Sequence, residues 1–155
     1  MAIEPRAGAE MLIRKPVSEV FEAFLDPEIT SKFWFTSGSG RLEEGKTVTW
    51  EWAMYGFSIP VNVKALEENR RILIDWPGEG DTLTQVEWIF TSRPDGSTFV
   101  SITNSGFTGD DALRAEQAIG STEGFAFVLA AAKAYLEHGV RLTLVADRFP
   151  DGLGA

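Results

Sequence analysis

Few side chains in this sequence have the types and spacings that catalysis needs. His138 is the single histidine, and it stands directly before Gly139 at the end of a predicted helix. An imidazole at that position can cap the last helix carbonyl groups, so we interpret it as structural. There is no cysteine, and the pair Asp110-Asp111 lacks the further oxygen ligands that a cation needs. The sequence therefore predicts no catalytic residue, no metal site and no cofactor.

Three acidic residues alternate with tryptophans on predicted strands. Glu51, Asp75 and Glu87 each stand beside a tryptophan in the sequence. Because successive side chains of a strand point to opposite faces, these acids should face solvent if the tryptophans face the interior. A bulge or a shift of register would turn an acid inward, where desolvation would raise its pKa and suit it to acid–base catalysis. The solvent-facing arrangement is our prediction.

Asn104 is the strongest polar candidate for the interior. It has the same parity as Val100 and Ile102, so its side chain should point toward the long helix. Two roles stay open for it. The amide either hydrogen-bonds a carbonyl or hydroxyl group of a ligand, or it bonds only to backbone at the end of its strand.

The elements that must position these residues begin with a strand and two short helices. Glu10 to Arg14 is the expected first strand, and Pro16 can open the following helix because its missing N–H is not needed there. Asp26-Pro27 ends this helix and can cap a second, shorter one. The first helix carries an apolar stripe formed by Val17, Val20, Phe21, Phe24 and Leu25.

From residue 47 onward the hydrophobic period changes to two, which predicts strands. Pro60 interrupts one of the alternating segments, which suits an edge strand or a bulge. Residues 37–40, Ser-Gly-Ser-Gly, should form a loop before them. Short turns separate the segments, so consecutive strands should be antiparallel neighbours. The alternating segments lie near residues 48–54, 57–63, 72–76, 86–90 and 100–102.

A long apolar helix completes the pattern. We expect it to run from Ser121, a suitable N-cap, to His138, with Gly139 as its stop. Its flanks are nearly as apolar as its main face, so it should be buried on more than one side. Residues 108–119 before it form either a short helix or an ordered loop, and both alternatives stay open.

This order of patterns predicts an α+β fold in which one helix lies across a curved antiparallel sheet. Such an arrangement leaves a cleft that side chains need not fill completely. We expect an apolar pocket there, because strand parity and the helix stripe direct the same residues inward. The predicted lining is Trp50, Trp52, Trp88, Ile102, Phe125 and Leu129, with Trp34 near the mouth and Asn104 as the polar candidate.

Length and charge limit the class of protein. The 155 residues should form a single domain over 1–155, with a core at about 8–139 and a tail at 140–155. The net charge of −9 repels phosphate backbones and anionic lipids, so neither nucleic acid nor a membrane surface is an expected partner. The longest apolar run, 125–132, is too short to span a bilayer, and the N-terminus lacks the apolar stretch of a secretory signal. We therefore expect a cytoplasmic protein.

Several of these segments together resemble a known protein family. Their order and spacing, over about residues 8–139, are similar to those of the bacterial Aha1-like proteins of the START-like, or SRPBCC, superfamily. The segments are Pro16 to Phe21, the Asp26-Pro27 break followed by Phe33-Trp34, the hairpin from Gly45 to Trp52, Thr98 to Gly106, and Leu136 to Gly139.

The resemblance implies a helix-grip fold, in which a curved six-stranded antiparallel sheet wraps around the C-terminal helix and two small helices close one end. Members of the superfamily bind lipids, sterols, polyketides or plant hormones in the intervening cavity, and some are cyclases or hydrolases. The Aha1-like branch is named after a co-chaperone that stimulates the ATPase of Hsp90. This sequence matches one domain and not the separate Hsp90-binding domain of the eukaryotic activator, so Hsp90 is not an expected partner.

Binding of a hydrophobic or amphiphilic small molecule in the cavity is the function that the sequence favours. One alternative is a cofactor-independent cyclase, dehydratase or hydrolase that uses the same cavity. A second alternative is a chaperone-accessory role or another role in protein interaction. The residues alone do not decide whether a reaction is catalysed.

Apolar residues also recur in the tail beyond the long helix. Val140, Leu142, Leu144 and Ala146 alternate with other residue types. Exposed apolar side chains usually find a partner, and the tail can do so by folding back on its own domain or by meeting a second copy. We expect a homodimer formed through residues 140–150 and the C-terminal helix.

Overall fold

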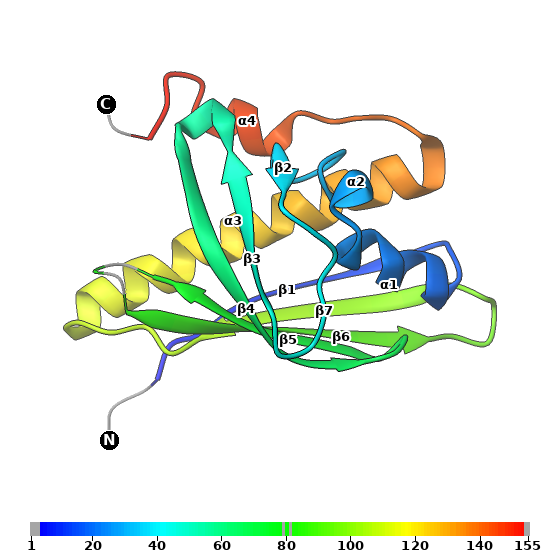
Figure 1. Ribbon diagram of the computed structural model, residues 1–155, viewed down its shortest axis with the longest axis horizontal. Helices are drawn as coiled ribbons and strands as arrows, with labels where there is room; N and C mark the ends of the chain where they lie inside the picture. Colours follow the sequence, from blue (N-terminus) through cyan, green and yellow to red (C-terminus); the bar gives the residue numbers. More distant parts are fainter. Residues whose placement is uncertain (1–3, 79, 81, 154–155) are drawn as a thin grey trace.

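Seven antiparallel strands form one curved sheet, and a single long helix crosses its inner side (Figure 1). This computed structural model describes residues 4–78, 80 and 82–153. The strand order is β1-β7-β6-β5-β4-β3-β2, so the first and last strands of the sequence are neighbours. The strands are β1 (Ala7–Ile13), β2 (Ser37–Gly38), β3 (Thr47–Trp52), β4 (Phe57–Glu67), β5 (Arg71–Pro77), β6 (Leu83–Ser92) and β7 (Thr98–Ser105).

The helices lie on one side of this sheet (Figure 1). They are α1 (Val17–Leu25), α2 (Pro27–Thr30), the 3-10 turn η1 (Ala53–Tyr55), α3 (Asp111–His138) and α4 (Leu144–Arg148). Pro27 opens α2 as predicted, and the Asp26 carboxylate accepts a hydrogen bond from the Glu28 N–H at 3.0 Å. Across the described residues, the helices are too short or too polar to cross a membrane. The curved antiparallel sheet and the long helix across it confirm the predicted α+β class and the helix-grip arrangement.

The sheet has one strand more than the resemblance implies. Residues 37–40, expected to be a loop, contribute β2, whose two residues pair with Glu51 and Trp50 of β3. Gly38 is required there, because an added Cβ would lie 2.8 Å from the Cβ of Pro27 and 3.1 Å from Cδ1 of Trp50. The close approach of α2 to this strand leaves no room for a side chain.

Pro60 lies inside β4 without disturbing the sheet. It pairs with Thr49 of β3, and the ladder between β4 and β5 extends only as far as Asn62 and Asp75. Pro60 therefore stands where β4 runs beyond its other neighbour, and no hydrogen bond to β5 is lost.

The long helix begins earlier than predicted. It starts at Asp111, and the side chain of Asp110 caps it by accepting a hydrogen bond from the Leu113 N–H at 2.8 Å. The prediction that Ser121 is the N-cap is therefore wrong. The Ser121 hydroxyl instead donates to Oδ1 of Asn104 at 2.8 Å, which ties the middle of α3 to the sheet.

The tail folds back on its own domain over part of its length. α3 ends at the predicted residue, and Gly139 takes the left-handed conformation, with φ of 67°, that stops the helix. Leu144 and Val145 of α4 then pack against the hydrophobic core. Val140 and Leu142 stay 48% and 38% exposed, so the tail leaves apolar surface uncovered before α4.

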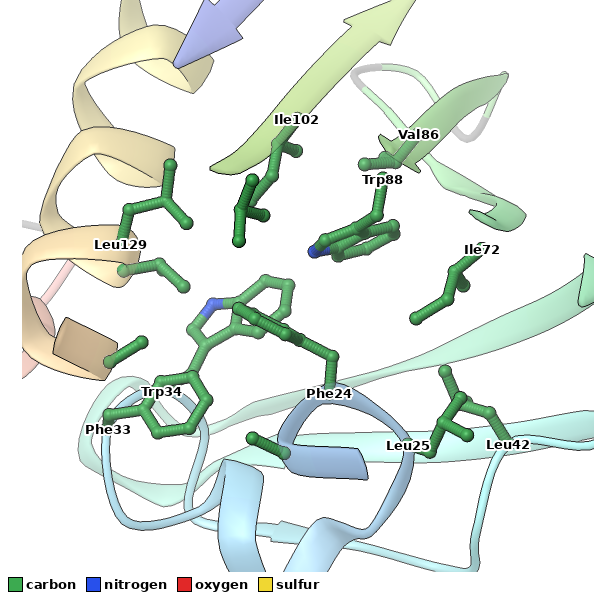
Figure 2. Packing of buried hydrophobic residues seen from close by; sticks show 14 of the residues in the cluster. Phe24, Leu25, Phe33, Trp34, Leu42, Ile72, Val86, Trp88, Ile102 and Leu129 are labelled. Carbon is green, nitrogen blue, oxygen red and sulfur yellow. The ribbon is translucent and has the colours of Figure 1, made fainter. Parts of the chain in front are cut away.

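Trp34 stands at the centre of the hydrophobic core (Figure 2). Its ring centroid lies 5.0 Å from that of Trp50, 6.1 Å from that of Trp88 and 5.8 Å from that of Phe125. These partners belong to β3, β6 and α3. Aromatic pairs of this kind add about 0.5–1.5 kcal/mol each beyond the burial of area. The connection after α2 therefore inserts between the sheet and the long helix and holds both.

An ion pair between the buried Glu137 carboxylate and the half-buried Lys133 fastens the end of α3 to β1. The Glu137 side chain is 8% exposed and accepts hydrogen bonds from the Arg14 N–H at 2.8 Å and from the Lys133 ammonium at 2.7 Å. Lys133 also donates to the Leu12 carbonyl oxygen at 2.7 Å. Burial disfavours the charged carboxylate, but the hydrogen bonds and the Lys133 charge outweigh it and lower the pKa of Glu137. The pair therefore stabilises the folded chain at neutral pH.

Replacing Glu137 with Gln should lower the free energy of unfolding by about 2 kcal/mol at pH 7, because it removes the charge from buried hydrogen bonds. Since the folded-state pKa is lowered, the wild-type protein should lose this contribution as the pH falls below about 4.3. Urea unfolding at pH 7 and pH 3 measures both effects. The exposed Lys46–Glu43 pair supplies the control, because Glu43→Gln should change stability by less than about 0.5 kcal/mol. Equal losses of stability from Glu137→Gln and Glu43→Gln would contradict a stabilising role of the Glu137 contacts.

Candidate functional site

A cavity of about 710 Å³ lies between one end of the sheet, the N-terminal half of α3 and α4. β3, β4 and β5 supply one side of its wall, and residues 116–128 of α3 supply another. Val145, Arg148 and Phe149 close a third side. Small-molecule sites in proteins typically measure about 300–1,000 Å³. The cavity is therefore large enough for a drug-sized molecule.

Two stacks of aromatic rings form much of this wall. In the first, Phe57 of β4 stacks on Trp52 at 5.3 Å and 17°, and on Tyr55 at 6.4 Å and 8°. In the second, Trp76 of β5 stacks on Phe125 of α3 at 5.9 Å and 18°. All of these side chains line the cavity. The wall is consequently rich in aromatic side chains that support one another by stacking.

The structure brings only some of the predicted lining residues to this cavity. Trp34, Trp52, Asn104 and Phe125 lie on its wall. The others are buried in the packed core and do not line it: Trp50, Trp88, Ile102 and Leu129.

The physical reason for this division is the position of Trp34. The prediction placed Trp34 near the mouth, but its ring lies between Phe24, Trp88 and the residues of α3 (Figure 2). It fills the part of the space between sheet and helix that the prediction left open. A ligand contact by any of these side chains stays a prediction.

Other wall residues were missed. Trp76 shares its parity with Ile72 and Ile74, so the rule that selected Trp52 could also have selected it. Tyr55 belongs to the η1 turn, where no period exists to indicate an inward direction. Phe149 reaches the cavity only because α4 folds back, which the alternation in the tail does not predict.

Gly120 and Gly124 keep the α3 side of the wall open. They stand one turn apart, both line the cavity, and an added Cβ at either would meet no atom within 4 Å. Glycine inside a helix costs about 1 kcal/mol relative to alanine, so helix stability does not explain them. Their effect is to leave bare backbone and free space along the cavity.

Asn104 of β7 lies on the cavity wall and joins the sheet to α3. Its Nδ2 donates to the Gln85 carbonyl oxygen at 2.8 Å and to the Thr84 hydroxyl at 3.1 Å. Its Oδ1 accepts from the Ser121 hydroxyl at 2.8 Å. The amide bonds to side chains as well as backbone, so the interpretation of Asn104 as a backbone contact alone is wrong.

Polar contacts hold α4 at the mouth of the cavity. The Tyr55 hydroxyl donates to the Val145 carbonyl oxygen, and the Arg148 guanidinium pairs with Glu123. Arg148 also lies 4.3 Å from the centre of the Phe149 ring. Burial raises the pKa of Tyr55, so its hydroxyl stays protonated and able to donate at neutral pH.

The groups considered for catalysis lie away from the cavity wall. His138 is exposed at the end of α3. Glu51, Asp75 and Glu87 alternate with the inward-facing residues of their strands, as predicted, and none of the three belongs to the wall. In the part of the chain that the structure describes, histidine and carboxylate side chains form no group of three or more that could hold a metal ion.

Comparison with known proteins connects this fold to a family. The sequence profile of the family described as "Activator of Hsp90 ATPase homolog 1-like protein" matches residues 14–137. This chain belongs to that family. Among curated proteins, none matches it. The comparisons leave the expectation that Hsp90 is not a partner untested.

Solved structures share the fold of this Aha1-like chain. The protein SSP2350 from Staphylococcus saprophyticus is 34% identical, with a TM-score of 0.73 over 88% of this chain and 95% of that one. The Aha1 dimer from Colwellia psychrerythraea is 19% identical, with a TM-score of 0.72 over 86% and 97%. DynU16, a putative protein in the dynemicin biosynthetic locus, is 21% identical, with a TM-score of 0.73 over 90% and 49%.

Open space around Gly124 leads to a stability prediction. Gly124→Ala should raise the free energy of unfolding by about 0.5–1 kcal/mol, because alanine favours the helix and its Cβ meets no neighbour. Gly139→Ala is the matched control and should lower stability by about 1 kcal/mol, since Gly139 has a φ of 67°. Urea unfolding of both variants checks the signs. A loss of stability in Gly124→Ala would contradict the open wall.

Proposed function

We propose that this protein binds a hydrophobic or amphiphilic small molecule in the cavity between α3 and the sheet. The observation that carries the proposal is an unfilled cavity of about 710 Å³ with stacked aromatic rings in its wall. A bound ligand would remove this apolar surface from water, which lowers the free energy and favours binding.

The cavity also contrasts with the packing of the rest of the molecule. Protein interiors are normally filled to the density of organic crystals, and the neighbouring core with Trp50, Trp88 and Leu129 fits that rule. Two helix positions that could carry side chains into the cavity carry Gly120 and Gly124 instead. This choice lowers helix stability by about 1 kcal/mol for each residue, which supports a use for the space.

Binding of Nile red, a neutral dye whose emission rises in apolar surroundings, tests this proposal. The wild-type protein should enhance the emission in a saturable way. Gly124→Leu should weaken binding by tenfold or more, because its Cβ has open space and the rest of its side chain adds volume at the cavity wall.

Gly40→Leu is the matched control for this test. Gly40 has equally open surroundings but lies outside the cavity wall, so its leucine should leave dye binding unchanged. Circular dichroism should show that both variants are folded. An equal dye signal from Gly124→Leu and the wild-type protein would exclude the cavity as the binding site.

We also propose that two copies of the chain associate through the exposed apolar start of the tail. Val140 and Leu142 are 48% and 38% exposed beside the end of α3. The homologue from Colwellia psychrerythraea is described as an Aha1 dimer. Covering these side chains with a second copy would remove apolar surface from water, which supports the association.

Sedimentation velocity at tens of micromolar protein tests the association. The full chain should sediment as a dimer, and the double substitution Val140→Ser with Leu142→Ser should shift it to the monomer. These substitutions leave Leu144 and Val145, the contacts of α4 with its own core, in place. A monomeric wild-type chain would reject the proposal, and so would a dimer that both substitutions leave intact.

A further inference from the structure

The hydrogen bonds around Asn104 determine which polar group can still serve a ligand. The Gln85 carbonyl oxygen can only accept, so the Asn104 atom 2.8 Å from it must be the amide nitrogen. The second hydrogen of that nitrogen goes to the Thr84 oxygen at 3.1 Å, and Oδ1 is taken by Ser121. Both amide hydrogens of Asn104 and the Ser121 hydroxyl hydrogen are therefore already used.

The hydroxyl hydrogen of Thr84 is the donor that remains for a ligand. The Thr84 oxygen accepts from Asn104, so its own hydrogen must point elsewhere, and among the described residues no acceptor for it is found. Thr84 is 3% exposed and lies on the cavity wall. Its methyl group lies beside Gly78, where an added Cβ would be 2.7 Å from it. The Thr84 hydroxyl is therefore a hydrogen-bond donor on a residue of the cavity wall.

The charges of the wall disfavour an anionic ligand. Arg148 is the only cationic side chain on the described wall, and it pairs with Glu123. Glu116 lies on the same wall, and the whole chain has a net charge of −9. A carboxylate buried here would lose hydration without gaining an unpaired cation.

The shape of the wall favours flat molecules. Trp52 and Phe57 present ring planes within 17° of each other, and Trp76 and Phe125 within 18°. Bare helix backbone at Gly120 and Gly124 also borders the cavity. A ligand ring can make offset-stacked or edge-to-face contacts with such aromatic side chains, and a rigid ring loses less conformational freedom on binding than a flexible chain.

From these contacts we infer that Thr84 selects the ligand of this cavity: a neutral, planar ring system with an oxygen that accepts the Thr84 hydrogen bond, such as a ketone. The inference rests on the proposed function, because it concerns the same cavity. It adds a specificity-determining residue and a chemical class of ligand.

Three probes of equal ring shape test the inference: 9-fluorenone, fluorene and fluorene-9-carboxylate. They carry a ketone oxygen, no oxygen and a carboxylate, respectively. Dissociation constants come from quenching of tryptophan emission, since Trp34, Trp52 and Trp76 line the cavity. Wild-type protein should bind fluorenone about fivefold more tightly than fluorene, the effect of about one net hydrogen bond. The carboxylate should bind more weakly than either.

Substitutions at Thr84 assign the preference. Thr84→Val keeps the shape but removes the donor, so fluorenone and fluorene should bind equally. Thr84→Ser should restore the preference for fluorenone, which a merely structural role would not predict. Thr91→Val, on the exposed face of the same strand, should change neither affinity.

The outcomes separate this inference from the proposed function. A fluorenone preference that persists in Thr84→Val would overturn the role of Thr84, and so would equal binding of the two neutral probes by the wild type. Tighter binding of the carboxylate would overturn the neutral class. In each case Gly124→Leu still reports whether the probes occupy the cavity. Failure of all three probes and of Nile red to bind would reject the proposed function itself.

Discussion

The packing of Trp34 between the sheet and α3 is the contact on which the rest of the structure depends. A large aromatic side chain that buries about 150–250 Å² contributes roughly 4–6 kcal/mol at 25 cal/mol per Å². The Trp34 ring meets Trp50 and Trp88 on one side and Trp76 and Phe125 on another. It thereby divides the space under the helix into a solid core and an open cavity.

The cavity half of the molecule departs from local rules that the core half follows. Helix α3 has glycine at 120 and 124, where alanine would be more stable, and the half-buried Ser121 bonds to Asn104 where an apolar residue could pack. The core follows packing rules closely, although the Trp88 Nε1–H has no acceptor there among the described residues. Departures from local stability that gather around one space are typical of functional sites.

Hydrophobic period was enough to predict most of the fold, because parity decides which face of a strand is buried. It identified the five long central strands, the stripe of α1 and the end of α3 at Gly139. It failed for the start of α3, since Gly120 and Ser121 look like a helix boundary in sequence while Asn104 supplies the partner of Ser121. Strand parity also predicts only the face on which a side chain lies, and not whether it lies in the packed core or on the cavity wall. Trp50 and Trp52 share a face, yet only Trp52 reaches the cavity, where Phe57 stacks on it.

The two ends of α3 are held by different kinds of interaction, and this difference gives the cavity its character. The C-terminal end has the Glu137–Lys133 pair and the Arg14 N–H, which together resist separation from β1. The cavity end is bordered by α4, whose Arg148–Glu123 pair is partly exposed and contributes less than about 1 kcal/mol. Local opening follows the weakest contacts, so it costs least free energy at α4. The α4 side of the wall is therefore held by weaker ionic contacts than the C-terminal end of α3.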